Sequence, residues 1–179
     1  MNIYIDKSYI KLLRLIWLII YFFLFRFTPP FLFNTWRIFL LNLFGAKVSW
    51  SAKVYPSVRI FKPWNLEMAN NSCLGRNVNC YNYDTIYIGN KSIISQNTFL
   101  CTASHNYNST KFELITNRIV IEKNVWVAAN CFVAPGVTMK ENSILLACSN
   151  LINDTKKNYI YAGNPAKIKK KRILFKNKL

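Results

Sequence analysis

The chain contains one histidine, His105, and this side chain is the best candidate for proton transfer. A neutral imidazole titrates close to physiological pH, so it can accept a proton from a hydroxyl group that attacks a substrate. The alternative is a surface histidine without a role. A single histidine rules out a His-rich metal site, and we expect no metal.

The cysteines do not suggest a second catalytic or metal-binding group. Their number, five, is odd, and no pair has the CxxC or Cys/His spacing of zinc ligands. Cys101 lies four residues before His105, where a nucleophilic thiol could lie, but no second histidine is available to activate it. We therefore interpret the cysteines as small structural thiols of a reducing compartment, such as the cytosol.

His105 lies where a six-residue repeat is interrupted. In each unit the first residue is a large aliphatic and the fifth is small or β-branched. The consecutive units of the clearest run begin at Ile121, Val127, Val133, Met139, Leu145 and Leu151. Earlier units begin at Met68, Leu74, Ile88, Ile94 and Leu100, with weaker ones at Val48 and Val54. A helix of about 3.6 residues per turn cannot keep a period of six on one face.

The fourth position of the repeat indicates tight corners. It is occupied mostly by asparagine and once by glycine, the residues that best tolerate the left-handed backbone region. These residues are Asn71, Asn77, Asn97, Asn124, Asn130, Asn142 and Gly136. Three units would make a triangular coil of about 18 residues, and stacked coils make a parallel β-helix. A β-sandwich does not keep phase over so many units.

The repeat divides the chain into three parts. We expect a helical, apolar and basic-flanked segment over residues 1–46, the β-helix over 47–155, and a basic extension over 156–179. Residues 80–87 shift the phase of the repeat, which predicts a bulge or short insertion. Residues 106–118 do not fit the repeat and are expected to form a loop that projects beside His105.

The N-terminal part leaves three alternatives open. Residues 15–25 are an unbroken apolar run, no small-residue cleavage site follows them, and basic residues flank or interrupt the run. The run is short for a membrane span. The segment could therefore lie on a membrane surface, pack on its own domain or on a neighbouring subunit, or span the bilayer.

The charge predicts an anionic partner. Lys and Arg number 24 against 7 Asp and Glu, which gives +17, and 52% of the residues are hydrophobic. Candidates are nucleic acid, a membrane surface and a phosphorylated ligand. The C-terminal part is densely basic, with Lys167, Lys169, Lys170, Lys171, Arg172, Lys176 and Lys178. Because no nucleic-acid-binding module is visible and aromatic residues do not interleave with this segment, we expect no nucleic acid partner.

Several ordered motifs resemble the bacterial hexapeptide-repeat acyltransferases, in particular the colanic-acid-type and maltose/galactoside O-acetyltransferase group. The matching stretches are residues 102–107, 124–127, 134–138 and 162–167, together with Trp36-Arg37 and residues 44–47. The resemblance implies an all-β fold, a left-handed parallel β-helix with an N-terminal apolar helical segment and a short basic C-terminal tail. It also implies a homotrimer.

The resemblance assigns roles to individual residues. His105 would be the general base, in a cleft between two subunits. Trp126 would line the pantetheine arm of acetyl-CoA, the backbone at Ala129 and Ala147 would hydrogen-bond it, and Lys167 would face the CoA phosphates. For Trp126 an aromatic subunit contact is the alternative, and for Lys167 a solvated lysine.

The acceptor residues depart from the family pattern. Where the galactoside branch has Asn or Asp in contact with the acceptor, this chain has Tyr81, and Asn82 or Asn79 could substitute. Ile152-Asn153 replaces a common Thr-Lys pair, which affects the expected grip on the CoA phosphates.

Together these features predict an acetyl-CoA-dependent O-acetyltransferase that acts on a sugar hydroxyl in bacterial surface polysaccharide biosynthesis. It would be cytoplasmic and could be peripheral at the inner face of the membrane, in contact through residues 1–46 and the basic tail. The alternatives are an N-acyltransferase of an amino-sugar nucleotide and a non-catalytic, membrane-associated β-helix scaffold.

Overall fold

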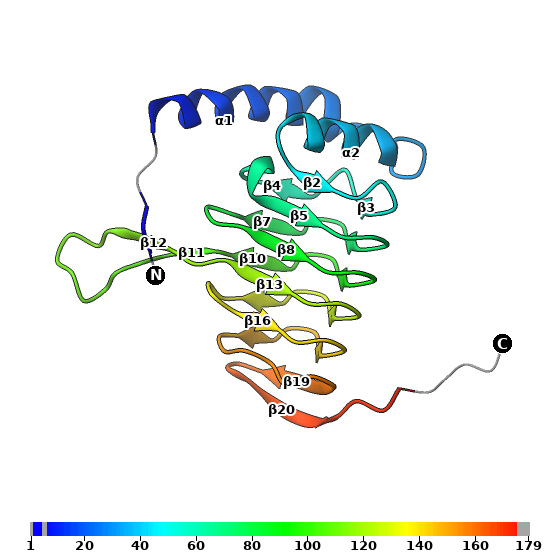
Figure 1. Ribbon diagram of the computed structural model, residues 1–179, viewed down its shortest axis with the longest axis vertical. Coiled ribbons are helices and arrows are strands. Elements are labelled where there is room, and N and C mark those ends of the chain that lie inside the picture. Colours follow the sequence, from blue (N-terminus) through cyan, green and yellow to red (C-terminus); the bar gives the residue numbers. More distant parts are fainter. Residues whose placement is uncertain (1, 5–6, 175–179) are drawn as a thin grey trace.

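A computed structural model describes residues 2–4 and 7–174, and most of them wind into a stack of triangular coils (Figure 1). The coils form three parallel sheets. Two helices lie across one end of the stack, and a β-hairpin closes the other end (Figure 1). The predicted all-β parallel β-helix with an N-terminal helical segment is confirmed.

The chain visits the three sheets in a fixed order, coil after coil. The first sheet contains β2 (Lys47–Val48), β5 (Leu66–Met68), β8 (Ile86–Ile88), β13 (Ile119–Ile121) and β16 (Thr138–Met139). The second contains β3 (Lys53–Val54), β6 (Cys73–Leu74), β9 (Ile93–Ile94), β14 (Trp126–Val127) and β17 (Ile144–Leu145). The third contains β4 (Arg59–Ile60), β7 (Asn79–Tyr81), β10 (Phe99–Cys101), β15 (Phe132–Val133) and β18 (Asn150–Leu151). We call the turns after these sheets the first, second and third corners.

The six-residue pattern has the predicted physical origin. Every first-position residue from Ile121 to Leu151 is buried, as is every fifth-position residue from Val125 to Thr155. The predicted asparagines and Gly136 all have positive φ, from 56° at Asn71 to 84° at Gly136. Lys91 and Cys148 take the same corner conformation at φ 57°, although neither residue type indicates it. Left-handed backbone costs such residues about 1–2 kcal/mol each.

The third corner carries every insertion. Val48 pairs with Met68 and Met68 with Ile88, a separation of 20 residues, whereas Ile121 pairs with Met139, a separation of 18. The two extra residues lie between β4 and β5, where Pro63–Asn65 form a 3-10 turn, and between β7 and β8. The predicted phase shift at residues 80–87 is confirmed, and the earlier one was missed.

The largest insertion, between β10 and β13, is a hairpin and not the loop expected for residues 106–118. β11 (Ala103–His105) pairs antiparallel with β12 (Leu114–Thr116), which lies inside the expected loop. β1 (Asn2–Ile3) adds a third strand to β12. The hairpin projects from the stack of coils (Figure 1).

The C-terminal part differs from the expected tail. β19 (Tyr159–Gly163) stacks on β17, and β20 (Ala166–Lys171) returns antiparallel to it, so the basic residues from Lys167 to Lys171 lie on a strand. Arg172 then donates to the carbonyl oxygens of Asn124 and Asn142 at 3.0 and 3.1 Å, which holds the hairpin on the coils. Lys176 and Lys178 lie outside the described residues.

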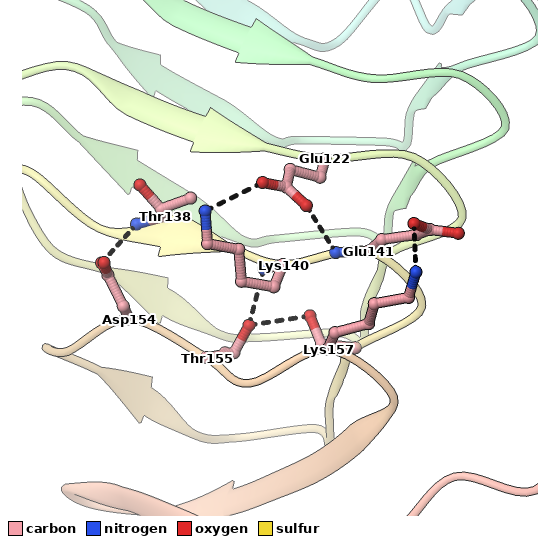
Figure 2. A network of polar contacts seen from close by, with 8 residues as sticks. Glu122, Thr138, Lys140, Glu141, Asp154, Thr155 and Lys157 are labelled. Atoms are coloured by element: carbon pink, nitrogen blue, oxygen red, sulfur yellow. Dashed lines mark hydrogen bonds and ion pairs between the residues drawn. The ribbon is translucent and has the colours of Figure 1, made fainter.

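Carboxylates tie successive coils together at the first corner (Figure 2). Glu122 accepts from Lys140 Nζ at 3.0 Å and from the Glu141 backbone N–H at 2.8 Å, and Glu141 pairs with Lys157 at 2.9 Å. Desolvation opposes the charge of Glu122, but these donors still hold its pKa below the ordinary value. Lys157, chiefly through its hydrogen bond, lowers the pKa of Glu141.

The N-terminal helix is fixed to the end of the stack by one face. α1 (Ser8–Ile20) continues as a π-helical turn (Tyr21–Phe25). Trp17 and Phe25 are buried against the coils, and Trp17 Nε1 donates to the carbonyl oxygen of Ile60 at 2.7 Å. Ser8–Phe25 together span 18 residues with a mean hydropathy of 1.8, and only 11% of these residues are buried. By length and composition alone, this segment is long and apolar enough to cross a membrane.

The second helix, α2 (Asn34–Leu43), holds a buried cation. The Arg37 side chain is fully buried, and it donates to the carbonyl oxygens of Val54, Pro29 and Pro30 and to the Thr28 hydroxyl. Burial lowers the pKa of this guanidinium. These four acceptors fix the loop between the helices on the first coil.

We predict that Arg37→Met lowers the free energy of unfolding by about 3 kcal/mol, because the buried acceptors lose their donors. Urea unfolding at neutral pH measures the loss. Arg118→Met, a matched substitution at an exposed position, should change the value by less than about 0.5 kcal/mol. Equal effects of the two substitutions would contradict this role of Arg37.

Candidate active site

His105 ends strand β11 on the projecting hairpin, and its ring orientation is set by the same hairpin. Its Nδ1 lies 2.6 Å from the carbonyl oxygen of Phe112. Since a carbonyl oxygen can only accept, Nδ1 carries the proton, and the neutral ring keeps Nε2 unprotonated. No described residue hydrogen-bonds Nε2, and the side chain is exposed. In this tautomer Nε2 can accept a proton, as a general base must.

The hairpin is built to present the Phe112 carbonyl. Phe112 has a φ of 45°, the left-handed region that a bulky residue rarely adopts. Beside it, Asn106 N–H donates to the Glu113 carbonyl oxygen at 2.9 Å. A hydrogen bond from the Ser109 hydroxyl lowers the pKa of the Glu113 carboxyl, so the loop keeps its charge.

The root of the hairpin is anchored to the coil above it. The buried Thr102 hydroxyl donates to the Tyr81 carbonyl oxygen at 3.0 Å and accepts from the Asp84 backbone N–H at 2.9 Å. These contacts join the strand that leads to His105 to the insertion after β7. The root of the hairpin that carries His105 is therefore anchored on two coils.

Two of the cysteines behave as structural residues, whereas Cys148 is exposed. Cys101 is buried, its Sγ lies 3.2 Å from the Ala103 carbonyl oxygen, and burial raises the pKa of its thiol. Burial also raises the pKa of Cys80 to about 12. Neither thiol is poised to form the thiolate that a nucleophile requires.

Three of the four predicted cofactor residues lie on the second sheet or its corner. Trp126 is 42% exposed on β14, and its Nε1 donates to Ser95 Oγ at 2.9 Å. Ala129 and Ala147 occupy the second corner on successive coils. Their carbonyl oxygens accept from the Cys148 N–H and the Ser149 hydroxyl, but neither backbone N–H is bonded to a described residue. The corner thus presents two stacked donors beside an exposed indole.

Lys167 is brought to the same side by the terminal hairpin. It lies opposite Ala162 on β20, one residue from the turn whose Gly163 N–H donates to Ser149 Oγ at 3.0 Å. Its side chain is exposed. The fold therefore gathers Trp126, Ala129, Ala147 and Lys167 along one edge of the second sheet.

The predicted acceptor residues separate into two kinds. Asn79 and Tyr81, on β7, are half-buried and line a pocket of about 550 Å³ between the third sheet and α1. Asn82 is fully buried: its oxygen accepts from the Phe61 and Lys62 N–H groups, and its amide donates to the Lys62 carbonyl oxygen. Because these bonds occupy its side chain, Asn82 is a structural residue, and the interpretation of it as an acceptor contact is not retained.

Sequence reasoning missed the cations of this pocket. Lys11 and Arg14 come from α1, and Arg59 comes from β4. Lys11 and Arg14 are three residues apart, the spacing of one helix face, but nothing in the sequence placed Arg59 opposite them. The carbonyl of Phe112 was missed as well, because a backbone contact leaves no trace in residue type.

Within one chain the two halves of the candidate site lie apart. The cofactor residues are at the second corner, which precedes each strand of the third sheet, and His105 is at the third corner, which follows it. The width of the third sheet separates them.

The chain matches curated acetyltransferases over most of its length. It is 39% identical over 150 residues to the Escherichia coli (strain K12) protein WcaF, whose name describes it as a colanic acid biosynthesis acetyltransferase. The match covers 84% of this chain and 82% of that protein. It is 28% identical to the galactoside O-acetyltransferase of the same organism, over 72% of this chain and 65% of the relative. No family model matches the sequence.

The fold agrees with solved structures. A galactoside acetyltransferase in complex with coenzyme A superposes with a TM-score of 0.84 at 23% identity, covering 98% of this chain and 92% of that one. The predicted left-handed parallel β-helix is confirmed by this likeness. An ordered repeat, a hairpin that presents one histidine and the extended identity to WcaF agree: the chain belongs to the hexapeptide-repeat acetyltransferases.

Proposed function

We propose that the protein transfers an acetyl group from acetyl-CoA to a sugar hydroxyl in bacterial surface polysaccharide biosynthesis. The orientation of His105 by the Phe112 carbonyl is the observation that carries the proposal, because it leaves Nε2 free to accept a proton. The sugar acceptor is supported by the names of the colanic acid and galactoside relatives.

In the proposed reaction, the acceptor hydroxyl gives its proton to His105 Nε2 while its oxygen attacks the thioester carbonyl carbon. The carbon–sulfur bond then breaks, and the proton passes from the imidazolium to the leaving CoA thiolate. No covalent enzyme intermediate is required, which agrees with the buried, high-pKa Cys101 thiol. The Nδ1–H bond to Phe112 stabilises the imidazolium and fixes its direction.

Acetyl-CoA would lie along the edge of the second sheet. The free N–H groups of Ala129 and Ala147 are spaced by one coil and suit the amides of a pantetheine arm. Trp126 would cover the arm, and the basic strand β20, with Lys167, would face the phosphates. Because this edge and His105 lie on opposite sides of the third sheet, we propose a homotrimer in which neighbouring chains complete each site.

We also propose that the protein is cytoplasmic and peripheral at the inner face of the membrane. The face of the N-terminal helix that points away from the coils is apolar, with Leu12 60%, Ile19 52% and Phe23 69% exposed. Arg26 and Lys7 flank the helix and suit anionic headgroups. The buried Trp17 and Phe25 keep the helix on the coils, which favours surface contact over a span.

We predict that nitrogen-15 NMR of neutral His105 finds the proton mainly on Nδ1. The chain has one histidine, so one imidazole is observed without assignment. The urea-unfolded protein is the control, because it lacks the Phe112 contact and should show the tautomer ratio of a free histidine. A proton mainly on Nε2 in the folded protein would exclude the proposed base.

We predict that His105→Ala lowers the turnover of acetyl transfer by about 10²–10⁴-fold, the usual contribution of a general base, while the Kd of acetyl-CoA stays within about twofold. Product mass against a panel of glycans and amino-sugar nucleotides measures transfer and separates O- from N-acylation. Tyr107→Phe, in the same loop, is the control. Unchanged turnover in His105→Ala would refute the base assignment.

We predict that replacing Leu12, Ile16, Ile19 and Phe23 with serine lowers binding to phosphatidylglycerol vesicles by at least about tenfold. These residues share the outward helix face, so their apolar area would no longer enter the bilayer. Vesicle sedimentation measures binding, and Tyr107→Ser, which removes an exposed aromatic from the hairpin, is the control. Equal binding by both variants would argue against membrane contact through the helix.

A further inference from the structure

The pocket between α1 and the third sheet combines an apolar wall with a cluster of cations. It encloses about 550 Å³, enough for a ligand of moderate size. Leu15, Trp17 and Leu18 line it from the helix, and Ile60 lines it from β4. Trp17 is buried and bonded to Ile60, so this wall is a fixed part of the fold.

Three cations border the same space. Arg14 places its guanidinium 3.9 Å from the ring centroid of Phe61, and Lys11 lies one helical turn before it. Arg59 reaches the pocket from β4. Among the described residues no carboxylate lines the pocket, and neither Lys11 nor Arg59 forms an ion pair.

Among the described residues, the carboxylates that could offset Lys11 and Arg59 are used elsewhere. Glu122 and Glu141 tie coils at the first corner, and Glu67 pairs with Lys47 at 2.8 Å. Asp154 accepts from the Thr138 backbone N–H at 2.7 Å. A ligand with a negative charge and an apolar portion would therefore suit Lys11, Arg59 and the wall.

We propose that this pocket binds one phosphorylated lipid, with the phosphate at Arg59 and Lys11 and the start of the hydrocarbon chain against Leu15 and Leu18. Guanidinium groups bind phosphate oxygens through paired charge-assisted hydrogen bonds. The exposed apolar face of α1 continues beside the pocket, so the rest of the chain can stay in the membrane.

This site deepens the proposed function, and it rests on that proposal for its link to acetyl transfer. Asn79 and Tyr81 line the pocket from β7, and β7 is the neighbour of β10, the strand that leads into the His105 hairpin. A sugar carried on the lipid phosphate would extend along this surface toward the hairpin. The acceptor class would then be a lipid-phosphate-linked glycan.

Calorimetric titration of the full chain with farnesyl phosphate, below its aggregation concentration, tests the site. We expect binding that weakens about tenfold in Arg59→Gln, since a charge-assisted hydrogen bond to phosphate is lost, and also weakens in Leu15→Ser. The matched controls are Arg118→Gln, which removes the same charge elsewhere, and Leu43→Ser, an exposed position of α2 outside the pocket. Both should bind as the unmodified chain does.

Three results would overturn the proposal. They are equal Kd values for Arg59→Gln and Arg118→Gln, inorganic phosphate or farnesol binding as tightly as farnesyl phosphate, and a change in sedimentation-equilibrium mass for Arg59→Gln. The last would mean that a second copy of the chain fills the pocket. Displacement of farnesyl phosphate by phosphatidylglycerol would assign the site to bulk phospholipid, and resistance to it would assign the site to a dedicated lipid phosphate.

The failure of this site and of the proposed function can be told apart in the unmodified protein. Acetylation of a soluble glycan without farnesyl phosphate binding would exclude the lipid site alone. Farnesyl phosphate binding without acetyl transfer to any soluble or lipid-linked acceptor would exclude the proposed function and leave the lipid site in place.

Discussion

The fold depends on corners that turn within a few residues while side chains fill the axis of the β-helix. The repeat units place an aliphatic side chain on the axis, and most of those after the first coil then turn through a residue in the left-handed region, such as Asn130 at φ 57°. Asparagine accepts this conformation at a lower cost than other residues with a side chain. The parallel pairing of Val127 with Leu145, and of every equivalent pair, follows from keeping these two positions in step.

The constraint applies to the axis positions and to the positive-φ residues, so the other residues of the corners are free to vary. The first corner ties coils through Glu122 and Glu141, and the second corner presents the stacked N–H groups of Ala129 and Ala147. The third corner accepts insertions, of which the largest presents His105. Structural features, the proposed donor site and the proposed general base thus occupy different corners of the coils.

The electrostatics follow the same division. The few carboxylates serve mainly as links between neighbouring segments, and their lowered pKa values at Glu122 and Glu141 reflect the donors that surround them. Two groups of cations lie near the two ends of the stack. The strand β20 faces the proposed donor side, and Lys11, Arg14 and Arg59 face the pocket under α1. The proposed phosphorylated cofactor at one end and the proposed phosphorylated lipid at the other would use part of this charge without a nucleic acid.

The sequence by itself determined the repeat. Axis and corner positions obey a strict local rule, so the buried residues from Ile121 to Leu151 and the positive-φ asparagines could be predicted from residue types and their spacing. His105 could be selected because it is unique and because the repeat stops beside it. The resemblance to known acyltransferases then supplied the candidate donor residues, which the fold gathers on one edge.

Only the tertiary structure decided features that depend on contacts across coils. Residues 106–118 belong to a hairpin because β12 pairs with β11 and β1. Asn82 is a structural residue because three backbone groups hold its side chain. The tautomer of His105 depends on the Phe112 carbonyl, and the pocket depends on the meeting of α1 with β4. Such contacts join segments far apart or involve backbone atoms, and neither residue type nor local spacing records them.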